Sequence, residues 1–262
     1  MIQLISKVWR YAKFYSRATS IRKIHSPFVF DFIENIVLNS TPYYVFEPLS
    51  SYRAFLSLNK TMLRVEDFGA GSSYSGGNNR EVSSILRQSV KPQKYAELIF
   101  RIVQNRKPRT MLELGTSLGL TSIYMAKAYK EGELISVEGS SEIAEVAKKG
   151  FEKFACKNIT QIVGNFDEVL PRILKEKSLI DFAFVDGNHR EAATLNYFNQ
   201  LVHHVKPDSI LIFDDIHWSK GMERAWEQIK DHTSVTLSID LFEMGLVFFM
   251  NRNQKEHHLI RF

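Results

Sequence analysis

The stretch TMLELGTSLGLTS, residues 110–122, decides the fold. Its first five residues are a short, mostly apolar run that predicts a strand, and residues 118–129 carry apolar side chains at helical spacing. Gly115 and Gly119 lie between these segments, where glycine lets the main chain turn sharply and lets a ligand come close. A strand joined to a helix in this way begins a βα unit. The stretch therefore predicts an α/β fold with a ligand site at the end of the strand.

The chain beyond this stretch continues to alternate short apolar runs with helical segments, as a parallel sheet requires. The last two apolar runs flank residues 242–245 and predict a terminal hairpin. Together the runs predict a doubly wound, mostly parallel seven-stranded sheet. The expected strands are 110–114, 134–137, 159–163, 182–185, 210–213, 235–241 and 246–250, and the expected helices are 118–129, 142–154, 167–174, 191–205 and 220–230.

The region before the sheet has a different pattern, with predicted helices over 24–38, 81–89 and 92–104. A loop rich in glycine, serine and asparagine occupies residues 69–79. We interpret it as a segment that covers the pocket when substrate binds, with an ordinary surface loop as the alternative. The simplest division of the chain is a helical extension over residues 1–90 and a core over residues 91–262.

Composition indicates an ordinary globular protein. Of 262 residues, 44% are hydrophobic and 24% are charged. No apolar run approaches the length of about 18 residues that a membrane span needs, so we expect no transmembrane segment. The first twenty residues lack the pattern of a secretory signal, and the single cysteine, Cys156, fits a reducing compartment. We therefore expect a cytoplasmic protein.

Part of the net charge of +5 is local to the N-terminus. Six bases precede the first acid, Asp31, and apolar residues alternate with them at helical spacing, which predicts a basic amphipathic helix. Such a helix packs its apolar side on a core, or it contacts a membrane surface, nucleic acid or an acidic partner. No RNA-binding module is visible, so we expect no nucleic-acid partner. The six bases are Lys7, Arg10, Lys13, Arg17, Arg22 and Lys23.

The glycine turn favours a cationic ligand over a pyrophosphate. Its spacing is G-x-x-x-G, and Glu113 stands two residues before the first glycine. A carboxylate at that place suits a positively charged group, whereas a pyrophosphate favours a closer glycine loop. Thr116, Ser117 and Thr121 add hydroxyls near the positive end of the following helix.

Two further strand ends carry polar residues that suit a nucleoside. Glu138, followed by Gly139, ends the second strand, where a carboxylate accepts hydrogen bonds from ribose hydroxyls. The alternative for Glu138 is a favourable charge at a helix N-terminus. Asn165 and Phe166 end the third strand and would contact the edge and the face of an adenine, although Phe166 equally suits the core.

These motifs resemble those of class I S-adenosylmethionine-dependent methyltransferases. The chain is most similar to the small-molecule O-methyltransferase group that includes the catechol and caffeoyl-CoA enzymes, over roughly residues 91–250. The resemblance implies a Rossmann-like sheet, S-adenosylmethionine as cofactor and methylation of a small-molecule hydroxyl. The motifs that carry it are residues 113–119, 137–139, 164–166 and 184–189.

Carried over by position, the resemblance assigns roles to single residues. The methionine end of the cofactor would contact the turn, the ribose would bind Glu138, and the adenine would lie between Asn165 and Phe166. Asn165 departs from the Asp of many relatives, and an amide still suits adenine. The residues assigned to the turn are Glu113, Gly115, Ser117 and Thr121, with Thr116 and Gly119 between them.

The next two strand ends predict the reaction site. The resemblance assigns Asp186 to the cofactor and to catalysis, and metal-dependent relatives bind a divalent cation with residues at the positions of Asp186, Asp214 and Asp215. Three carboxylates suit Mg²⁺, which would lower the pKa of a bound hydroxyl. Asp215 stands where those relatives carry Asn, and the alternative is that it caps the next helix.

His189 is the candidate general base, because an unperturbed imidazole titrates near neutrality and the residue follows Asp186 closely. His217 is a second candidate, and a structural hydrogen bond is the alternative for either residue. Rival interpretations of the whole chain are a nicotinamide-dependent oxidoreductase and a noncatalytic S-adenosylmethionine- or nucleotide-binding protein. Apolar faces on the N-terminal helices would allow a homodimer. The substrate is not named by the sequence.

Overall fold

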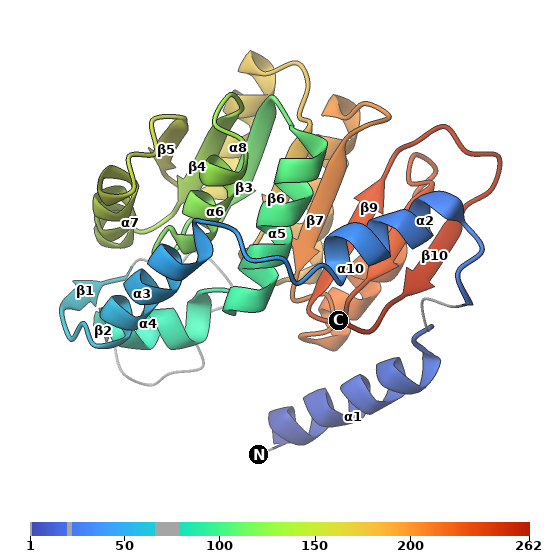
Figure 1. Cartoon of the computed structure of the whole chain (residues 1–262), viewed down its shortest axis with the longest axis horizontal. Coiled ribbons are helices and arrows are strands. Elements are labelled where there is room, and N and C mark those ends of the chain that lie inside the picture. Colours follow the sequence, from blue (N-terminus) through green and yellow to red (C-terminus); the bar gives the residue numbers. More distant parts are fainter. Residues whose placement is uncertain (1, 20–22, 66–78) are drawn as a thin grey trace. The chain divides into compact units, whose positions relative to one another are not determined.

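The computed structural model describes residues 2–19, 23–65 and 79–262. All of the loop predicted at 69–79 except Asn79 lies outside the described residues. The chain divides into two compact units, which Figure 1 shows with their elements. Unit 1 comprises Met1–Asn39 and Glu176–Phe262, and unit 2 comprises Ser40–Lys175. These bounds differ from the predicted division at residue 90, because the helices that follow residue 40 pack on the strands of unit 2.

Unit 2 contains three parallel strands in the order β3-β4-β5. They are β3 (Thr110–Leu114), β4 (Glu133–Glu138) and β5 (Ile159–Val163). Strands β3 and β4 are almost entirely buried, as continuous apolar runs in parallel sheets are. The pairing places Glu113 of β3 opposite Ser136 of β4. This register brings the polar residues of the two strands into contact.

The helices of unit 2 share one hydrophobic core with its strands. Phe46, Phe100 and Tyr124 meet in this core, with ring centroids 5.1–6.5 Å apart. Unit 2 also contains a short antiparallel pair of strands, β1 (Met62–Arg64) and β2 (Asn79–Glu81). In the sequence, both strands come between α3 and α4. The helices are α3 (Phe46–Ser57), α4 (Val82–Ser89), α5 (Gln93–Arg106), α6 (Leu120–Ala128), α7 (Ser141–Lys153) and α8 (Phe166–Glu176).

Unit 1 contains five strands in the order β10-β8-β9-β7-β6. Strand β9 is antiparallel to both of its neighbours, which confirms the predicted terminal hairpin. The described residues thus form a mostly parallel sheet of eight strands, one more than predicted. The five strands are β6 (Phe182–Val185), β7 (Ile210–Asp214), β8 (Leu237–Asp240), β9 (Met244–Phe248) and β10 (Glu256–Leu259), of which β10 was missed.

Helices cover both faces of β9. Phe32 meets Phe248 edge to face at 5.4 Å, and Trp226 packs directly over Gly245. Residues three apart on a strand point to opposite faces, so the two contacts lie on opposite sides, as in a doubly wound fold. The helical elements of unit 1 are α1 (Ile2–Arg17), α2 (Pro27–Phe32), a π-helical turn (Ile33–Val37), α9 (Glu191–Leu201), a 3₁₀ turn (Val202–His204) and α10 (Lys220–Asp231).

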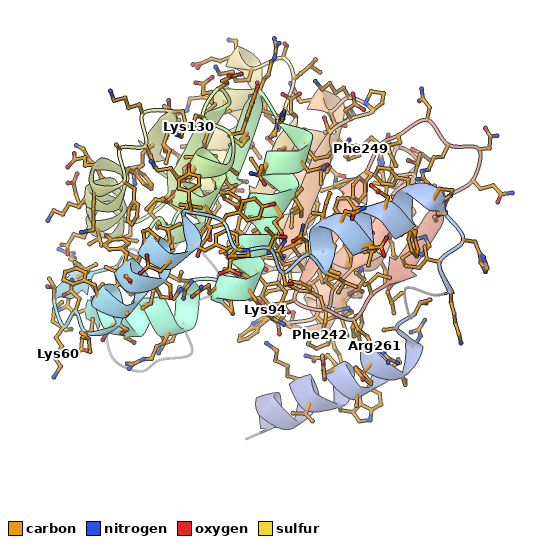
Figure 2. All side chains as sticks on the ribbon, viewed as in Figure 1. Lys60, Lys94, Lys130, Phe242, Phe249 and Arg261 are labelled. Atoms are coloured by element: carbon orange, nitrogen blue, oxygen red, sulfur yellow. The ribbon has the colours of Figure 1, made fainter. Side chains whose placement is uncertain are left out.

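The predicted N-terminal helix is α1, and it packs on the turn between β8 and β9. Phe14 and Ala18 form a small buried cluster with Phe242, against which Leu259 also packs. Figure 2 labels Phe242 at this place. One side of the amphipathic helix therefore docks on unit 1, as expected. Among the described residues, no helix has both the length and the apolar character that crossing a membrane requires.

Replacement of Gly245 tests how tightly α10 packs on the sheet. A Cβ at Gly245 would lie 2.5 Å from Cζ3 of Trp226, so Gly245→Ala forces the indole or the strand to move. Overpacking of this kind costs about 1–3 kcal/mol, and we expect the free energy of unfolding in urea to fall by that amount. Gly221→Ala on the same helix is the control, because its Cβ would meet nothing closer than 3.5 Å. Equal stability of the two variants would contradict this packing.

Candidate functional site

The glycine turn at the end of β3 has the conformation that the sequence predicts. Gly115, Ser117 and Gly119 all have positive φ angles, of 107°, 47° and 77°. A Cβ on Gly119 would lie 2.7 Å from a ring carbon of Phe151 and 2.9 Å from Cβ of Ala147. Both the backbone conformation and the closeness of α7 therefore require glycine at position 119.

Glu113 lies fully buried beneath this turn at the centre of a hydroxyl network. Its Oε2 accepts hydrogen bonds from the hydroxyls of Ser122 and Ser136, each at 2.5 Å. Thr116 Oγ1 lies 2.6 Å from Ser136 Oγ. Because Ser136 gives its only hydroxyl proton to Glu113, Thr116 is the donor in that pair. The Thr116 hydroxyl thus supports the buried acid, and its contact with the cofactor stays a prediction.

Burial raises the pKa of Glu113 from 4.5 to about 8, outweighing the two serine hydrogen bonds that lower it, and the charge of Glu138 raises it further. Its second oxygen, Oε1, is buried and has no hydrogen-bond partner among the described residues. A carboxyl group in this position keeps its proton at neutral pH unless a cation takes the place of that proton. The predicted preference of the site for a positively charged ligand stays a prediction.

Glu138 ties the end of β4 to the glycine turn. Its Oε2 accepts a hydrogen bond from the backbone N–H of Ser117 at 2.8 Å, and its Oε1 accepts one from that of Ser140 at 3.0 Å. Burial raises the pKa of Glu138, and the backbone N–H groups of Ser140, Ser117 and Gly139 act in the opposite direction. A carboxylate offers about four acceptor positions, so with these three backbone groups bound one stays available for a ribose hydroxyl.

The third strand end carries a helix cap as well as the candidate adenine contacts. Asn165 Oδ1 accepts a hydrogen bond from the backbone N–H of Asp167 at 3.0 Å, at the start of α8. This leaves the amide N–H₂ group as the part of Asn165 suited to a base edge. Phe166 is the first residue of α8 and is half-buried. A binding role for these two residues stays a prediction.

The predicted reaction residues belong to unit 1, and they surround His189. Nε2 of His189 lies 3.6 Å from Oδ1 of Asp186 and 3.9 Å from Oδ2 of Asp215. Asn188, His189 and Asp215 all have positive φ angles, of 64°, 24° and 53°. Three non-glycine residues in this sparsely populated conformation cost energy, and such strain gathers at functional sites.

The predicted metal ligands are not arranged as one group. Asp186 and Asp215 both face His189, whereas Asp214 is the last residue of β7 and is almost fully buried. Within residues 2–19, 23–65 and 79–262, no three His, Cys, Asp or Glu side chains are placed to hold a metal ion together. The arrangement of these three carboxylates therefore does not support the predicted magnesium site.

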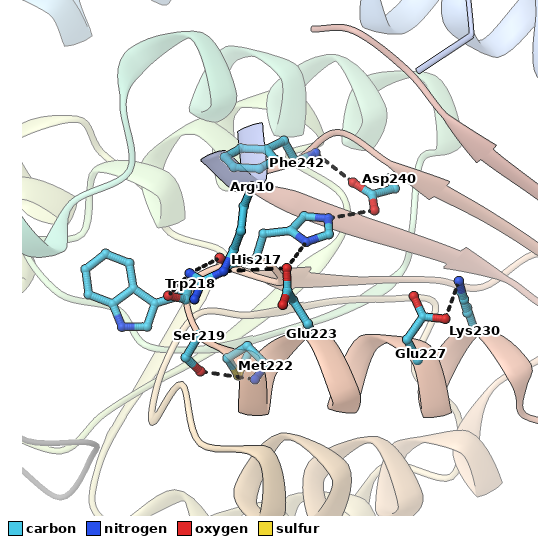
Figure 3. Close-up of polar contacts among 10 residues, drawn as sticks. All are labelled: Arg10, His217, Trp218, Ser219, Met222, Glu223, Glu227, Lys230, Asp240 and Phe242. Carbon is cyan, nitrogen blue, oxygen red and sulfur yellow. Dashed lines mark hydrogen bonds and ion pairs between the residues drawn. The ribbon is translucent and has the colours of Figure 1, made fainter. Parts of the chain in front are cut away.

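His217, the second candidate base, has a structural role. Its Nε2 lies 2.8 Å from Oδ2 of Asp240 and its Nδ1 lies 3.4 Å from Oε1 of Glu223 (Figure 3). Burial lowers its pKa, but the hydrogen bonds and charges of Asp240 and Glu223 outweigh burial, so the pKa of His217 is raised overall. An imidazole with a carboxylate on each nitrogen holds its proton and is a poor general base.

Helix α1 reaches the segment that follows Asp215. Nη1 of Arg10 donates to the backbone oxygen of Trp218 at 3.0 Å and to that of His217 at 3.3 Å, and Nε lies 3.7 Å from Oε1 of Glu223 (Figure 3). The His217 ring stacks on Phe242 at 5.1 Å. The N-terminal helix therefore fixes the loop between β7 and α10, which begins with one of the predicted reaction residues.

Comparison with known proteins identifies the central part of the chain. Residues 112–216 match a family model described as a methyltransferase domain. This segment, which is less than half of the chain, therefore resembles a methyltransferase domain. It contains all the predicted cofactor and reaction residues: Glu113, Gly115, Thr116, Ser117, Gly119, Thr121, Glu138, Gly139, Asn165, Phe166, Asp186, His189, Asp214 and Asp215.

Curated relatives of the methyltransferase domain are O-methyltransferases by name. A catechol O-methyltransferase of Niastella koreensis is 29% identical over 133 residues, which are 49% of this chain and 58% of that protein. A transmembrane O-methyltransferase homolog of Rattus norvegicus is 33% identical over 89 residues, which are 32% of this chain and 33% of that protein. The matched stretches span less than two thirds of either relative.

Solved structures show the same fold over most of the chain. The O-methyltransferase TomG from Streptomyces achromogenes, in complex with S-adenosylmethionine, is 17% identical with a TM-score of 0.58, and the match covers 84% of this chain and 95% of TomG. An O-methyltransferase from Bacillus cereus, in complex with S-adenosylhomocysteine, is 17% identical with a TM-score of 0.55, covering 83% and 96% of the two chains. The predicted Rossmann-like methyltransferase fold is confirmed.

Several residues that hold the candidate site residues in place were missed by the sequence interpretation. Ser136 and Ser122 hold Glu113, and Asp240 and Glu223 hold His217. Ser122 was readable, since it ends the decisive stretch one helical turn beyond the second glycine. Ser136 and Asp240 come from segments that are distant in the sequence from Glu113 and His217. No local sequence motif reveals such contacts.

The pKa of Glu113 predicts how stability depends on pH. The folded protein keeps the Glu113 proton up to about pH 8, whereas the unfolded chain loses it near its ordinary pKa of about 4.3. The contribution of Glu113 to the free energy of unfolding is therefore most favourable at low pH, and it is lost as the pH rises between these two pKa values. We expect the free energy of unfolding of the wild type to fall across this interval relative to that of Glu113→Gln, measured in urea at pH 5 to 9. Parallel curves for the two proteins would contradict a raised pKa.

Proposed function

We propose that the chain binds S-adenosylmethionine through unit 2 and methylates a hydroxyl group of a small molecule. The observation that carries the proposal is the contact between Glu138 and the glycine turn, where the backbone N–H of Ser117 donates to the carboxylate at 2.8 Å. This contact holds the carboxylate of Glu138 beside the glycine turn, whose main chain would contact the ligand. The turn directly follows the strand that carries the buried acid Glu113. A nucleoside attached to a cationic amino acid suits both features.

The residues of unit 2 suit each part of this cofactor. Glu138 would bind the ribose, the amide group of Asn165 and the ring of Phe166 would contact the adenine, and Gly115, Gly119 and Thr121 would line the amino-acid end with Ser117. Ser117 Oγ is buried without a hydrogen-bond partner among the described residues, so a ligand group would satisfy it. When bound, S-adenosylmethionine supplies an electrophilic methyl group on a sulfonium.

His189 is the proposed general base. It would take the proton of the acceptor hydroxyl on Nδ1, because Nε2 faces the carboxylates of Asp186 and Asp215 at 3.6 and 3.9 Å and would carry the N–H of the neutral ring. An imidazolium formed there is stabilised by both carboxylates, as a base oriented by an acid requires. This role needs no bound cation. A Mg²⁺ ion held by Asp186, Asp214 and Asp215 is the alternative, and a chelator distinguishes the two.

The names of the curated relatives support oxygen as the acceptor atom, and small phenols and catechols are the first acceptors to test. A cytoplasmic location and a homodimer stay predictions of the sequence. If the tests of cofactor binding and turnover fail, the rival interpretations are a nicotinamide-dependent oxidoreductase and a noncatalytic binding protein. A protein that binds the cofactor but methylates no acceptor would favour the noncatalytic one.

Replacement of Glu138 tests cofactor binding. We expect wild-type protein to bind S-adenosylhomocysteine in calorimetric titration, and Glu138→Gln to bind it about 10–100-fold more weakly, because the charge-assisted hydrogen bond to the ribose is lost. Glu145→Gln is the matched control, since Glu145 is an exposed acid on the adjacent helix α7. A folded wild-type protein that binds no S-adenosylhomocysteine would overturn the proposal.

Replacement of His189 tests catalysis apart from binding. We expect His189→Ala to lower kcat about 10²–10⁴-fold while leaving the affinity for S-adenosylhomocysteine unchanged, because a general base contributes that much. Turnover would be measured on a panel of phenols and catechols, with His203→Ala as a control at an exposed histidine. EDTA is expected to leave wild-type turnover intact. Loss of activity in EDTA that Mg²⁺ restores would transfer the role to a metal ion.

A further inference from the structure

Helix α1 carries cations on two sides, and those on its docked side are neutralised. Lys7 Nζ lies 3.0 Å from Oε1 of Glu243, and Arg10 Nε lies 3.7 Å from Oε1 of Glu223. Phe14 follows them in the sequence, is buried, and packs on Phe242 and Leu259. The attachment of α1 to unit 1 therefore combines these two ion pairs with apolar contacts of Tyr11, Phe14 and Ala18 on Phe242.

The other side of α1 combines exposed apolar residues with cations that have no acidic partner. The side chains of Val8 and Trp9 are 61% and 66% exposed, so unit 1 leaves most of their apolar surface uncovered. Lys13 lies over the Trp9 ring at 5.7 Å, and neither Lys13 nor Arg17 forms an ion pair with an acid in the described part of the chain. The sequence from Ile2 to Arg17 contains no acid at all.

The C-terminus extends this surface. The guanidinium of Arg261 lies 3.9 Å from the ring of Tyr15, which is 47% exposed, and donates to the backbone oxygen of Tyr15 at 3.0 Å. Figure 2 labels Arg261 beside α1. We call the group of residues on this side the outer face of α1. It consists of Val8, Trp9, Lys13, Tyr15, Arg17 and Arg261.

We propose that the outer face of α1 docks the protein on the surface of a membrane that contains anionic lipids. Cations without acidic partners are attracted to such a surface, and each one adds to the free energy of binding. Tryptophan and tyrosine favour the boundary between headgroups and acyl chains, where an amphipathic ring is half in water. The outer face supplies both kinds of residue along one helix, and it is complementary in charge to anionic headgroups.

The helix lies on the membrane and does not cross it. Sixteen residues extend about 24 Å, less than the roughly 30 Å of the hydrocarbon core. Its docked side is bound to unit 1 through Arg10 and Phe14. An interfacial helix buries one apolar side at the headgroup boundary and keeps its other contacts, and α1 fits this arrangement.

A lipid surface fits the outer face better than a nucleic acid does. The phosphate backbone would satisfy Lys13, Arg17 and Arg261 equally well. It would offer nothing to Val8, whose apolar side chain stays in water against phosphates and is removed from water among acyl chains. Binding to RNA is therefore a rival outcome of the experiment.

Vesicle flotation with the full-length protein tests the proposal directly. We expect the protein to float with vesicles of 70% phosphatidylcholine and 30% phosphatidylglycerol, and to stay at the bottom of the gradient with pure phosphatidylcholine. Binding should weaken as NaCl rises from 0.1 to 0.5 M, because salt screens the cations. Absence of binding to the anionic vesicles at 0.1 M NaCl would overturn the proposal.

Two variants separate the apolar and the electrostatic contributions. Trp9→Ala is expected to lower the partition coefficient roughly tenfold, and the double variant Lys13→Glu with Arg17→Glu at least about 25-fold, at a factor of about five per charge. Phe55→Ala on α3, which is 63% exposed, and Lys148→Glu with Lys149→Glu on α7 are the matched controls. Their binding should equal that of the wild type.

The outcomes are distinguishable from those of the methyltransferase tests. Equal loss of binding in the α7 control would mean that net charge alone acts, and an unchanged Trp9→Ala would mean that no side chain enters the lipid; either result overturns the proposal. Binding of a 20-nucleotide RNA that competes with the vesicles and is unaffected by Trp9→Ala would replace it by the rival. S-adenosylhomocysteine titration of the Trp9→Ala protein checks that the fold and the cofactor site are intact.

Discussion

The hydrogen bond from the backbone N–H of Ser117 to the carboxylate of Glu138 is the contact on which the rest of unit 2 depends. It joins the turn after β3 to the end of β4, and it forms only because Ser117 adopts a left-handed conformation between two left-handed glycines. Glycine is required at position 119 in turn, because a Cβ there would lie too close to α7. Helix packing, backbone conformation and the position of one carboxylate are therefore a single constraint. A change to any one of them displaces the proposed ribose contact.

The buried acid Glu113 adds a second constraint from below. Two serine hydroxyls lower its pKa, yet removal from water dominates, so it keeps a proton at neutral pH. Burying a carboxyl group without a cation is costly, and the chain tolerates that cost at the point where a cationic ligand would meet the turn. The ligand would then complete the electrostatics of a site that folding alone leaves unbalanced. This argument depends on charge and burial, and it holds whatever the acceptor substrate is.

The sequence predicted the fold well where a segment's own residues determine its structure. Strands β3, β5 and β6 have the predicted bounds, because each is a compact apolar run between turn residues. It failed for β10, whose sequence EHHL has three polar residues in four and becomes a strand by pairing with β8. The network of Glu113 was hidden for a related reason: Ser136 meets it through the register of two parallel strands, and a sequence does not reveal register.

The same distinction explains the reaction side. The positions of Asp186, His189 and Asp215 follow from the ends of β6 and β7, so the sequence could place them near one another. The role of His217 could not be foreseen, because Asp240 comes from β8 and Arg10 from the other end of the chain. The contacts of Asp240 and Glu223 with the two ring nitrogens remove His217 from the list of bases, and Arg10 holds the backbone of the same loop after Asp215. Among the described residues, His189 has no such pair of carboxylates with one on each nitrogen, and it stays the proposed general base.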